Sequence, residues 1–402
     1  MHVIVIGNGL CGTIFAKTLR DIDADIEIDI FGQEQYLYYP RPNLIEFLAG
    51  HMPYDRLFAF SEAWYSDHNI RLHLAQKVEK IDPAAKTVEF KNRGVKKYDK
   101  LLLAHGAYAG VPPIKNVNKS GVFTLRTLED ALNIQAYLKD RKKVVVIGGG
   151  LLGLEIARAL KAGGAEVAVV EFFPRLLPRQ LDTQAATLLK RQIENMGIQV
   201  LLDKTTEEVL GGGEATGLRF KDGGEIAADM IVVAAGVRPY LDLAQESGLE
   251  TDRGVIVNAY LQTSHPDIYA AGDVSEHKGR VHGIIPASFQ QARTAAYNIS
   301  GQVQEYEGTV PSNTLKVMGV HVTSLGLVNP EEEGYEEIFK LDAAQGCYKK
   351  VVLQNGALVG AIWMGSKEGI NEINRLVAQN AKIGGHKADI LEDSFDLSRL
   401  IK

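Results

Sequence analysis

The sequence predicts an α/β protein with two Rossmann-like dinucleotide-binding domains and a small α+β domain at the C-terminus. Two stretches carry this prediction: the chain opens MHVIVIGNGLCGTIFAKTLR, and residues 142–161 read KKVVVIGGGLLGLEIARALK. In each stretch a run of β-branched residues leads into a glycine-rich turn and then into an apolar helix pattern. From about residue 311 the pattern changes to short strands around a single helix, which indicates the third domain.

Composition sets the broad class of the protein. With 402 residues, 46% of them apolar and 23% charged, the chain is typical of a globular protein of two to four domains. The net charge of -6 is spread along the sequence, which argues against nucleic acid or an anionic membrane surface as a partner. We also expect no signal peptide, because the first strand begins directly after Met1, and no apolar run reaches the roughly 18 residues of a membrane span. Two cysteines far apart, Cys11 and Cys347, suggest neither a disulfide framework nor a metal site and favour the cytoplasm.

The two repeats predict the same elements twice. The first repeat predicts a strand over 2–6, a helix over 12–21 and a strand over 25–31, and the second predicts these elements over 143–147, 151–162 and 166–172. The first strands are apolar throughout, as in parallel sheets covered on both faces. We therefore expect one dinucleotide-binding domain over 1–110 and 240–310, a second over 111–239 and a C-terminal domain over 311–402.

Shorter patterns fill in the remaining elements. Residues 86–90 and 95–103 read as a strand pair around a turn at Asn92–Gly94, within the basic stretch Lys91–Lys100. This stretch is either a solvated hairpin or a docking surface for an acidic protein. Helices are predicted over 127–140, 181–197, 285–301 and 367–380, and strands over 201–210, 217–223, 225–236, 314–326, 335–341 and 346–365, with an exposed turn at 211–213.

Each glycine turn is suited to bind a pyrophosphate. In G-x-G-x-x-G the first glycine makes the tight turn, the second leaves space for phosphate and the third packs the helix against the strand. The backbone N–H groups and the positive end of the helix dipole then face the phosphates. The candidate residues are Gly7, Gly9, Leu10, Cys11 and Gly12 in the first turn and Gly148, Gly150, Leu151, Leu152 and Gly153 in the second.

An acidic residue about twenty positions further on is expected to bind the ribose hydroxyls. In the second repeat this residue is Glu171, whose carboxylate repels a 2′-phosphate and so favours NADH over NADPH, although nearby Arg175 leaves NADPH as an alternative. In the first repeat the strand ends at Gly32, and the nearest carboxylate is Glu34. Either glutamate could instead only cap its loop.

A third motif adds redox chemistry. TSHPDIYAAGD, at residues 263–273, resembles the second flavin fingerprint of two-dinucleotide flavoproteins, in which a terminal aspartate binds the ribityl hydroxyls of FAD. With AAGVRP at 234–239 and LLLAHGA at 101–107, the whole chain resembles the pyridine nucleotide-disulfide oxidoreductase superfamily. The resemblance implies cofactor contacts from Gly272, Asp273, Ala104, His105, Gly106, Ala235 and Gly236. His105 departs from the small hydroxyl residue that is usual in this turn, so it either contacts the FAD or is structural.

The stretch QYLYYPRPNLIEFLAG, at residues 35–50, indicates the branch. It contains no cysteine where relatives that reduce disulfides or peroxides carry a reactive one, so thiol chemistry loses its central group. It resembles NADH:rubredoxin oxidoreductases and the flavin modules of NAD(P)H-dependent nitrite reductases. By this resemblance, Arg41, Pro42 and Arg126 lie near the FAD, Val78 beside the adenine and Ile285 at the pyrimidine end of the isoalloxazine.

The resemblance implies an FAD-dependent NADH oxidoreductase. Glu155 matches the acidic residue beside the nicotinamide, although a carboxylate one turn into a helix is also favoured by the dipole. The sequence offers no iron ligands, so a separate carrier such as rubredoxin or a ferredoxin-like protein is the expected acceptor. Trp363 either belongs to the docking surface or lies in the core, and a homodimer is one alternative for the assembly. A direct NADH oxidase or peroxidase, or a low-turnover NADH-sensing subunit, stays open.

Overall fold

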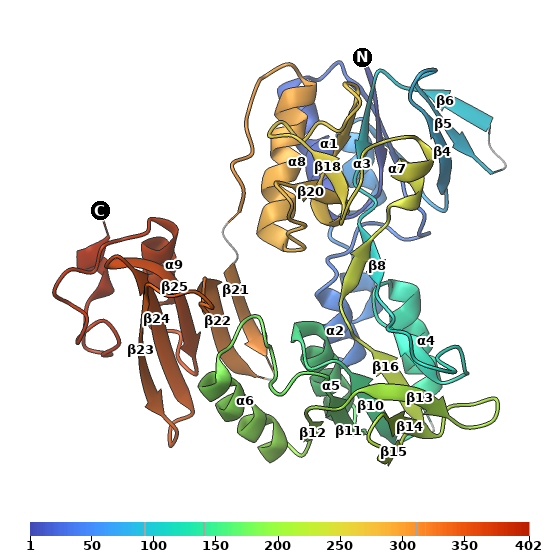
Figure 1. Cartoon of the computed structure of the whole chain (residues 1–402). Coiled ribbons are helices and arrows are strands. Elements are labelled where there is room, and N and C mark those ends of the chain that lie inside the picture. The colour runs from blue at the N-terminus through green and yellow to red at the C-terminus, as the bar shows by residue number, and fades with distance from the viewer. Residues whose placement is uncertain (92–93, 140, 310–311, 318, 402) are drawn as a thin grey trace. The chain divides into compact units, whose positions relative to one another are not determined.

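The computed structural model describes residues 1–91, 94–139, 141–309, 312–317 and 319–401 (Figure 1). The chain forms two compact units. The first holds Met1–Phe47, His51–Tyr108 and Val237–Thr309, and the second holds Leu48–Gly50, Ala109–Gly236 and Val310–Lys402. The predicted fold class is confirmed, because each unit contains a parallel sheet of the Rossmann type and the C-terminal part adds an antiparallel sheet. The finer division into three domains stays a prediction.

The first unit is built on a parallel five-stranded sheet in the order β19-β7-β1-β2-β3. Its strands are β1 (His2–Ile6), β2 (Glu27–Phe31), β3 (Ile70–His73), β7 (Lys100–Leu103) and β19 (Ile268–Ala270). The side chains of β1 are buried from Val3 to Ile6, as expected of a parallel strand with both faces covered. Helix α1 (Leu10–Ile22) packs against α8 (Ile285–Ile299), which lies far away in the sequence. Strand β19 pairs with β7, although more than 160 residues separate them in the sequence. The first sheet is therefore built from two distant parts of the chain.

Smaller elements complete the first unit. Strands β4 (Val78–Asp82), β5 (Thr87–Phe90) and β6 (Gly94–Lys97) form an antiparallel sheet, β8 (Ala107–Ala109) pairs with β17 (Val237–Pro239), and β18 (Val255–Val257) pairs with β20 (Ser275–His277). The helical elements are α2 (Asn43–Leu48), η1 (Tyr54–Arg56), α3 (Glu62–Asp67), α7 (Asp242–Glu246) and η2 (Gly272–Val274). The predicted strand pair is present as β5 and β6, while the turn residues Asn92 and Arg93 lie outside the described residues.

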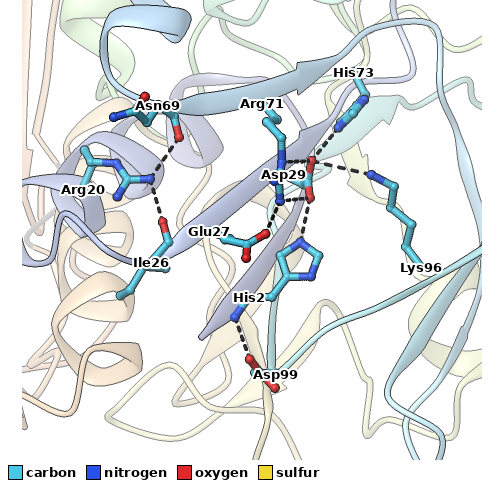
Figure 2. A network of polar contacts seen from close by, with 10 residues as sticks. All are labelled: His2, Arg20, Ile26, Glu27, Asp29, Asn69, Arg71, His73, Lys96 and Asp99. Atoms are coloured by element: carbon cyan, nitrogen blue, oxygen red, sulfur yellow. Dashed lines mark hydrogen bonds and ion pairs between the residues drawn. The ribbon is translucent and has the colours of Figure 1, made fainter.

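A buried carboxylate ties three strands of the first sheet to β6 (Figure 2). The side chain of Asp29, on β2, is only 1% exposed. Its oxygens accept hydrogen bonds of 3.0 and 2.9 Å from Arg71 on β3 and lie 2.6 Å from Nε2 of both His2 on β1 and His73 on β3. Lys96 Nζ, on β6, is 3.7 Å away. Burial alone would raise the pKa of Asp29, but the hydrogen bonds from Arg71, His73 and His2 hold it well below its usual range.

The second unit repeats the same sheet. Its order is β12-β11-β10-β16-β9, all parallel, with β9 (Val122–Thr124), β10 (Lys143–Ile147), β11 (Glu166–Val170), β12 (Gln199–Leu201) and β16 (Met230–Val233). The helices are α4 (Leu128–Leu138), α5 (Leu151–Ala162) and α6 (Thr183–Asn195), and β13 (Thr206–Leu210), β14 (Gly217–Phe220) and β15 (Glu225–Ala227) form a small antiparallel sheet. Strand β10 pairs with β11 and β16 just as β1 pairs with β2 and β7. The sequence duplication is therefore a duplication of structure.

The C-terminal part of the second unit is an antiparallel sheet with a helix on one face. The sheet order is β21-β22-β25-β24-β23, with β21 (Ser312–Val317), β22 (Val320–Gly326), β23 (Tyr335–Asp342), β24 (Cys347–Gln354) and β25 (Ala357–Met364), followed by α9 (Ile370–Ala378) and η3 (Leu397–Leu400). An Asn-Gly turn with positive φ at both residues joins β24 to β25. Trp363 is 1% exposed in a core shared with α9, and its indole N–H donates to the Glu368 carbonyl. Of the two roles predicted for Trp363, the structure shows the core role.

Predicted and observed helices agree to within a few residues. The first helix begins at Leu10 instead of residue 12, because Gly9 is its N-cap residue and the next residue already belongs to the helix. Helix α5 has the predicted bounds of 151–162. Within the described residues, no helix combines the length and apolar character that a membrane crossing requires.

Candidate functional site

The first glycine loop joins β1 to α1. Gly7 has φ +117°, in the left-handed region, and a methyl group on it would lie 2.3 Å from the Ala104 carbonyl oxygen. A methyl group on Gly12 would lie 2.0 Å from the Gly7 carbonyl oxygen, whereas one on Gly9 would have no heavy atom of the described residues within 4 Å. The first and third positions are thus closed by the protein's own backbone, and the second is open where a pyrophosphate is expected.

The second loop, between β10 and α5, has the same geometry. Gly148 has φ +121°, and a methyl group on it would lie 2.4 Å from the Ala234 carbonyl oxygen. On Gly153 the methyl group would lie 2.0 Å from the Gly148 carbonyl oxygen, while around Gly150 the space is again free of described atoms. Both loops therefore have a backbone geometry that would fit a dinucleotide, and the contacts of their glycines with phosphate stay a prediction.

Both helix N-termini are free of competing groups. The N-cap residues Gly9 and Gly150 have no capping side chain, and neither α1 nor α5 carries an acidic residue in its first turn. The first backbone N–H groups of a helix have no partner within the helix, so they can donate to an anion. The residues that start these helices, Leu10 and Leu151, lie where the sequence predicts phosphate contacts.

Asn8, inside the first loop, is a site residue that sequence reasoning missed. Its Oδ1 accepts hydrogen bonds of 3.0 Å from the Tyr65 hydroxyl and 3.4 Å from the Thr13 hydroxyl. Its Nδ2 is buried and has no hydrogen-bond partner among the described residues. Because leaving a buried donor unpaired is costly, this atom indicates an acceptor-rich ligand such as FAD at the loop.

Glu171 follows β11 and is 6% exposed. Its Oε2 accepts a hydrogen bond from the Gly149 backbone N–H, and its Oε1 accepts one of 2.8 Å from the Phe173 N–H. These bonds fix the carboxylate beside the glycine loop. Since a carboxylate offers about four acceptor directions, Glu171 retains capacity for ribose hydroxyls.

Glu34 is held in a polar cluster of the first unit. Arg41 Nη2 donates to Glu34 Oε1 at 2.8 Å, the Tyr39 hydroxyl donates to Oε2, and Arg41 Nη1 donates to the Tyr39 oxygen at 2.9 Å. The segment before Val78 lies alongside, because the Ala75 and Gln76 N–H groups donate to the carbonyls of Glu34 and Gly32. The structure therefore brings Glu34 and Arg41 together and places the segment before Val78 beside Glu34, with Pro42 between Arg41 and α2.

The segments after β7 and β16 correspond to one another. The Ala104 N–H donates to the Ile6 carbonyl, as the Ala234 N–H does to the Ile147 carbonyl. Two residues later, Gly106 and Gly236 both have positive φ, of +76° and +97°. By this correspondence His105 occupies the position of Ala235 in the second repeat.

His105 lies half-buried beside the first glycine loop. Its Nε2 is 3.1 Å from the Tyr240 carbonyl oxygen, and its buried Nδ1 has no partner among the described residues. Burial lowers the pKa of His105 to about 4, against the opposing effect of the Tyr240 carbonyl, so the imidazole is neutral at neutral pH. Since Nε2 faces a carbonyl, it carries the proton and Nδ1 is an acceptor.

The fingerprint around Asp273 lies against the first loop. Gly272 has φ +80°, and a methyl group on it would lie 3.1 Å from the Cβ of Cys11. The Gly272 N–H donates to Oε1 of Gln291, a buried side chain of α8, at 2.8 Å. Gly272 and Asp273 are thus placed next to α1, the helix that follows the first glycine loop; this loop and the start of its helix are called the first cradle below, and the second loop with the start of α5 the second cradle.

The remaining predicted residues are placed as follows. Glu155, on α5, accepts a hydrogen bond of 2.9 Å from Arg158 Nε, and Leu152 is exposed on the same helix. Ile285 is exposed as the first residue of α8 in the first unit. Arg126 belongs to the second unit, where its backbone N–H donates to Asp130. Its role toward the FAD of the first unit therefore rests on the resemblance alone.

Neither cysteine has the environment of a reactive thiol. Burial, with the charge of Asp273, raises the pKa of Cys11 far above its ordinary value. The pKa of Cys347 is also raised by burial. In the part of the chain that the structure describes, no three His, Cys, Asp or Glu side chains are arranged to hold a metal ion.

Comparison with known proteins shows which families the chain resembles. Residues 1–297 match the family described as pyridine nucleotide-disulphide oxidoreductase, and residues 311–381 match the rubredoxin NAD+ reductase C-terminal domain. The chain is 39% identical over 395 residues to the nitrite reductase [NAD(P)H] of Bacillus subtilis, covering 98% of this chain and 48% of that protein. The chain spans about half the length of the nitrite reductases it matches.

Other relatives match over most or all of their length. The NADH-rubredoxin oxidoreductase of Clostridium acetobutylicum is 30% identical over 372 residues, which are 91% of this chain and 92% of that protein. A solved ferredoxin reductase from Rhodopseudomonas palustris superimposes with a TM-score of 0.90 at 26% identity, covering 100% of both chains. FAD and NADH, the two predicted cofactors, are those of such enzymes, and the chain has two glycine loops whose geometry would fit a dinucleotide. The chain belongs to the pyridine nucleotide-disulphide oxidoreductase family.

Proposed function

We propose that this protein is an FAD-dependent NADH oxidoreductase that passes electrons to a small electron-carrier protein such as rubredoxin. One observation carries the proposal: a single chain contains two dinucleotide cradles of matching geometry, and neither of its cysteines has the environment of a reactive thiol. When bound, FAD supplies the chemistry that connects a two-electron donor with a one-electron acceptor.

The residues of the first unit hold the FAD in this proposal. Gly7, Gly9 and Gly12 shape the space for the pyrophosphate, and Asn8 Nδ2 supplies a donor. Glu34, fixed by Arg41 and Tyr39, accepts from the adenosine ribose. Asp273 accepts from the ribityl hydroxyls.

The residues of the second unit hold NADH. Gly148, Gly150 and Gly153 shape the pyrophosphate space, and Glu171 accepts from the ribose hydroxyls and repels a 2′-phosphate. Glu155 helps to orient the nicotinamide and to exclude water from it. Fast transfer requires such positioning, because the reacting atoms must approach to roughly 3 to 3.5 Å.

The proposed acceptor rests on two similarities. The C-terminal part matches a domain described for rubredoxin NAD+ reductases, and a relative that matches over 92% of its length is an NADH-rubredoxin oxidoreductase. The free cysteines are those of a protein in a reducing compartment, so we place the reaction in the cytoplasm. A direct NADH oxidase is the second candidate, because a Methanocaldococcus jannaschii protein named NADH oxidase is 33% identical over 345 residues.

An anaerobic stopped-flow experiment tests the proposal. NADH is mixed with the FAD-loaded protein, and the loss of flavin absorbance is followed. The reduced protein is then mixed with rubredoxin, a ferredoxin or oxygen. We expect rapid reduction by NADH, slower reduction by NADPH and reoxidation by a carrier protein far faster than by oxygen. Equal rates with carriers and oxygen would support the oxidase, and no reduction by either nucleotide would exclude both candidates.

A further inference from the structure

Two phenylalanines stand exposed at the edge of the second sheet where NADH is expected. Phe172 is 61% exposed and Phe173 is 48% exposed, although large aromatic side chains are usually buried. Their rings meet edge to face, with centroids 5.2 Å apart. They follow β11 directly, at the carboxyl end of the strand, which is the edge where doubly wound sheets bind their ligands.

The position of the pair relative to Glu171 is fixed by the backbone. The Phe173 N–H donates to Glu171 Oε1 at 2.8 Å, and the Phe173 carbonyl accepts from the Asp203 N–H at 3.2 Å. The Lys204 N–H donates to the Glu171 carbonyl at 3.0 Å. Residues 171–173 are therefore held between the glycine loop and the loop after β12, so the exposure of the rings belongs to a fixed segment.

The chemistry of the ligand indicates which part of it meets these rings. If Glu171 binds the adenosine ribose, the adenine base is one glycosidic bond away from that ribose. A base carries a flat π face, and aromatic side chains are the groups on which bases stack. Two cations lie close in sequence or space: Lys204 is engaged with Asp222 and lies over the Phe220 ring, and Arg175 donates to the Pro178 carbonyl at 3.1 Å.

We propose that Phe172 is the ring on which the adenine of NADH stacks, with Phe173 supporting it edge to face. The assignment rests on the proposed binding of NADH to the second cradle. It makes the Phe172–Phe173 pair a determinant of nucleotide affinity that acts through the adenine and leaves the nicotinamide untouched. Donors without adenine consequently gain nothing from the pair.

The test uses the FAD-loaded protein and three ligands: ADP-ribose, NADH and reduced nicotinamide mononucleotide. ADP-ribose carries the adenosine but no nicotinamide, so its dissociation constant can be measured by calorimetry without any reaction. Flavin reduction by NADH is compared with reduction by reduced nicotinamide mononucleotide, which lacks the adenosine. The variants are Phe172→Ala, Phe172→Tyr and Phe173→Ala, and Met196→Ala is the matched control because Met196 is an exposed apolar residue of the same unit, at the end of α6.

We expect Phe172→Ala to weaken ADP-ribose binding and to raise the KM for NADH by roughly ten-fold, in line with the loss of one base stack. Phe172→Tyr keeps the ring and restores both values, Phe173→Ala has a smaller effect, and Met196→Ala has none. The maximal rate with NADH and the rate with the mononucleotide stay within about two-fold of wild type, a split that general misfolding would not produce.

Two results would overturn the assignment: unchanged ADP-ribose affinity in Phe172→Ala, or an equal loss with NADH and with the mononucleotide. If wild-type protein binds no ADP-ribose and is not reduced by NADH, the proposed function itself fails. The two failures are therefore distinguishable.

Discussion

His105 stands where the related proteins usually have a small hydroxyl residue, and this difference has a measurable effect on stability. The turn after β7 accommodates an imidazole whose Nε2 faces the Tyr240 carbonyl and whose Nδ1 has no partner among the described residues. An imidazole in this environment is kept neutral. Protonation of His105 therefore lowers the free energy of unfolding.

We predict a pH effect on stability from this residue. The pKa of His105 is lowered from 6.5 to about 4, so between these values the unfolded chain binds a proton that the folded chain does not. Stability accordingly falls as pH drops from about 6.5 to 4, by at most about 3 kcal/mol from this residue. His105→Gln should unfold in urea with a shallower dependence on pH over this range. Identical slopes in the variant and wild type would show that His105 has no such effect.

At the scale of single residues, the sequence was informative about backbone roles and weaker on side-chain partners. The glycine positions could be predicted because only steric fit decides them, and both loops have the expected geometry. Glu171 could be named as the acidic residue, but its bonds to the N–H groups of Gly149 and Phe173 depend on how the loop turns. Asn8 gave no signal, because an unpaired donor is visible only when its surroundings are known.

At the scale of elements, the Asp29 network holds adjacent strands together. The sequence gave no sign of it, because Asp29 is one of three carboxylates that alternate with apolar residues in DIEIDIF, and its partners come from three other strands. Strand register brings Arg71 directly opposite Asp29. Such cross-strand partners depend on pairing that local patterns do not specify.

Removing the carboxylate should be costly. Asp29→Asn removes the buried charge that pairs with Arg71 and Lys96 and weakens the hydrogen bonds from Arg71, while Arg71 keeps only its exposed partner Glu27. Because Arg71 and Lys96 are themselves partly exposed, we expect the loss of these charged hydrogen bonds to cost about 1–3 kcal/mol. We expect the thermal midpoint to fall by several degrees. Glu27→Gln is the control, because Glu27 pairs with Arg71 at the surface, where solvent screening leaves an ion pair little effect on stability. If the two variants have equal midpoints, the network is not a major source of stability.

The pH dependence of this element follows from the same carboxylate. Because the pKa of Asp29 is lowered in the fold, its stabilisation is fully present above the usual aspartate range and is lost as pH falls below it. Its sign is the same as that of His105, but its window lies at more acidic pH. Comparing the two variants across pH separates the two contributions.

At the scale of the whole molecule, the second unit contains contacts between α6 and the C-terminal sheet. Asp182, the N-cap residue of α6, lies 3.1 Å from Lys350 Nζ and accepts a hydrogen bond from the Tyr348 hydroxyl, both on β24. Nearby, Gln192 donates to the Gly346 carbonyl at 3.2 Å. Lys350 is 3% exposed, so this contact is largely shielded from water.

We predict that Lys350→Met loosens this contact. The substitution keeps the length of the side chain and removes its charge, which leaves Asp182 without its cation at a cost of about 3 kcal/mol. Hydrogen exchange should increase at the start of α6 and along β24. Lys387→Met, which breaks an exposed ion pair with Glu336, should change neither. Unchanged exchange in Lys350→Met would show that the apolar contacts alone hold the two elements.

The duplication made the architecture predictable at this largest scale, because each repeat specifies a complete strand-helix-strand unit. The discontinuous FAD-binding domain stays a prediction implied by the resemblance at 263–273, and β19, within this stretch, pairs with β7 of the first sheet. The contact between α6 and β24 was not predictable, because Asp182 and Lys350 are far apart in sequence and ordinary in composition.

The packing of Cys11 against Gly272 has a practical consequence. Its sulfur lies beneath the first cradle, while Cys347 is partly accessible, so a maleimide should label Cys347 first and Cys11 only when the cradle opens. Mass spectrometry of the labelled peptides would then give the labelling rate of Cys11, with the rate of Cys347 as the internal reference. Adding FAD should slow the labelling of Cys11 and leave that of Cys347 unchanged. Equal labelling rates at both cysteines would mean that the region of the first glycine loop opens frequently.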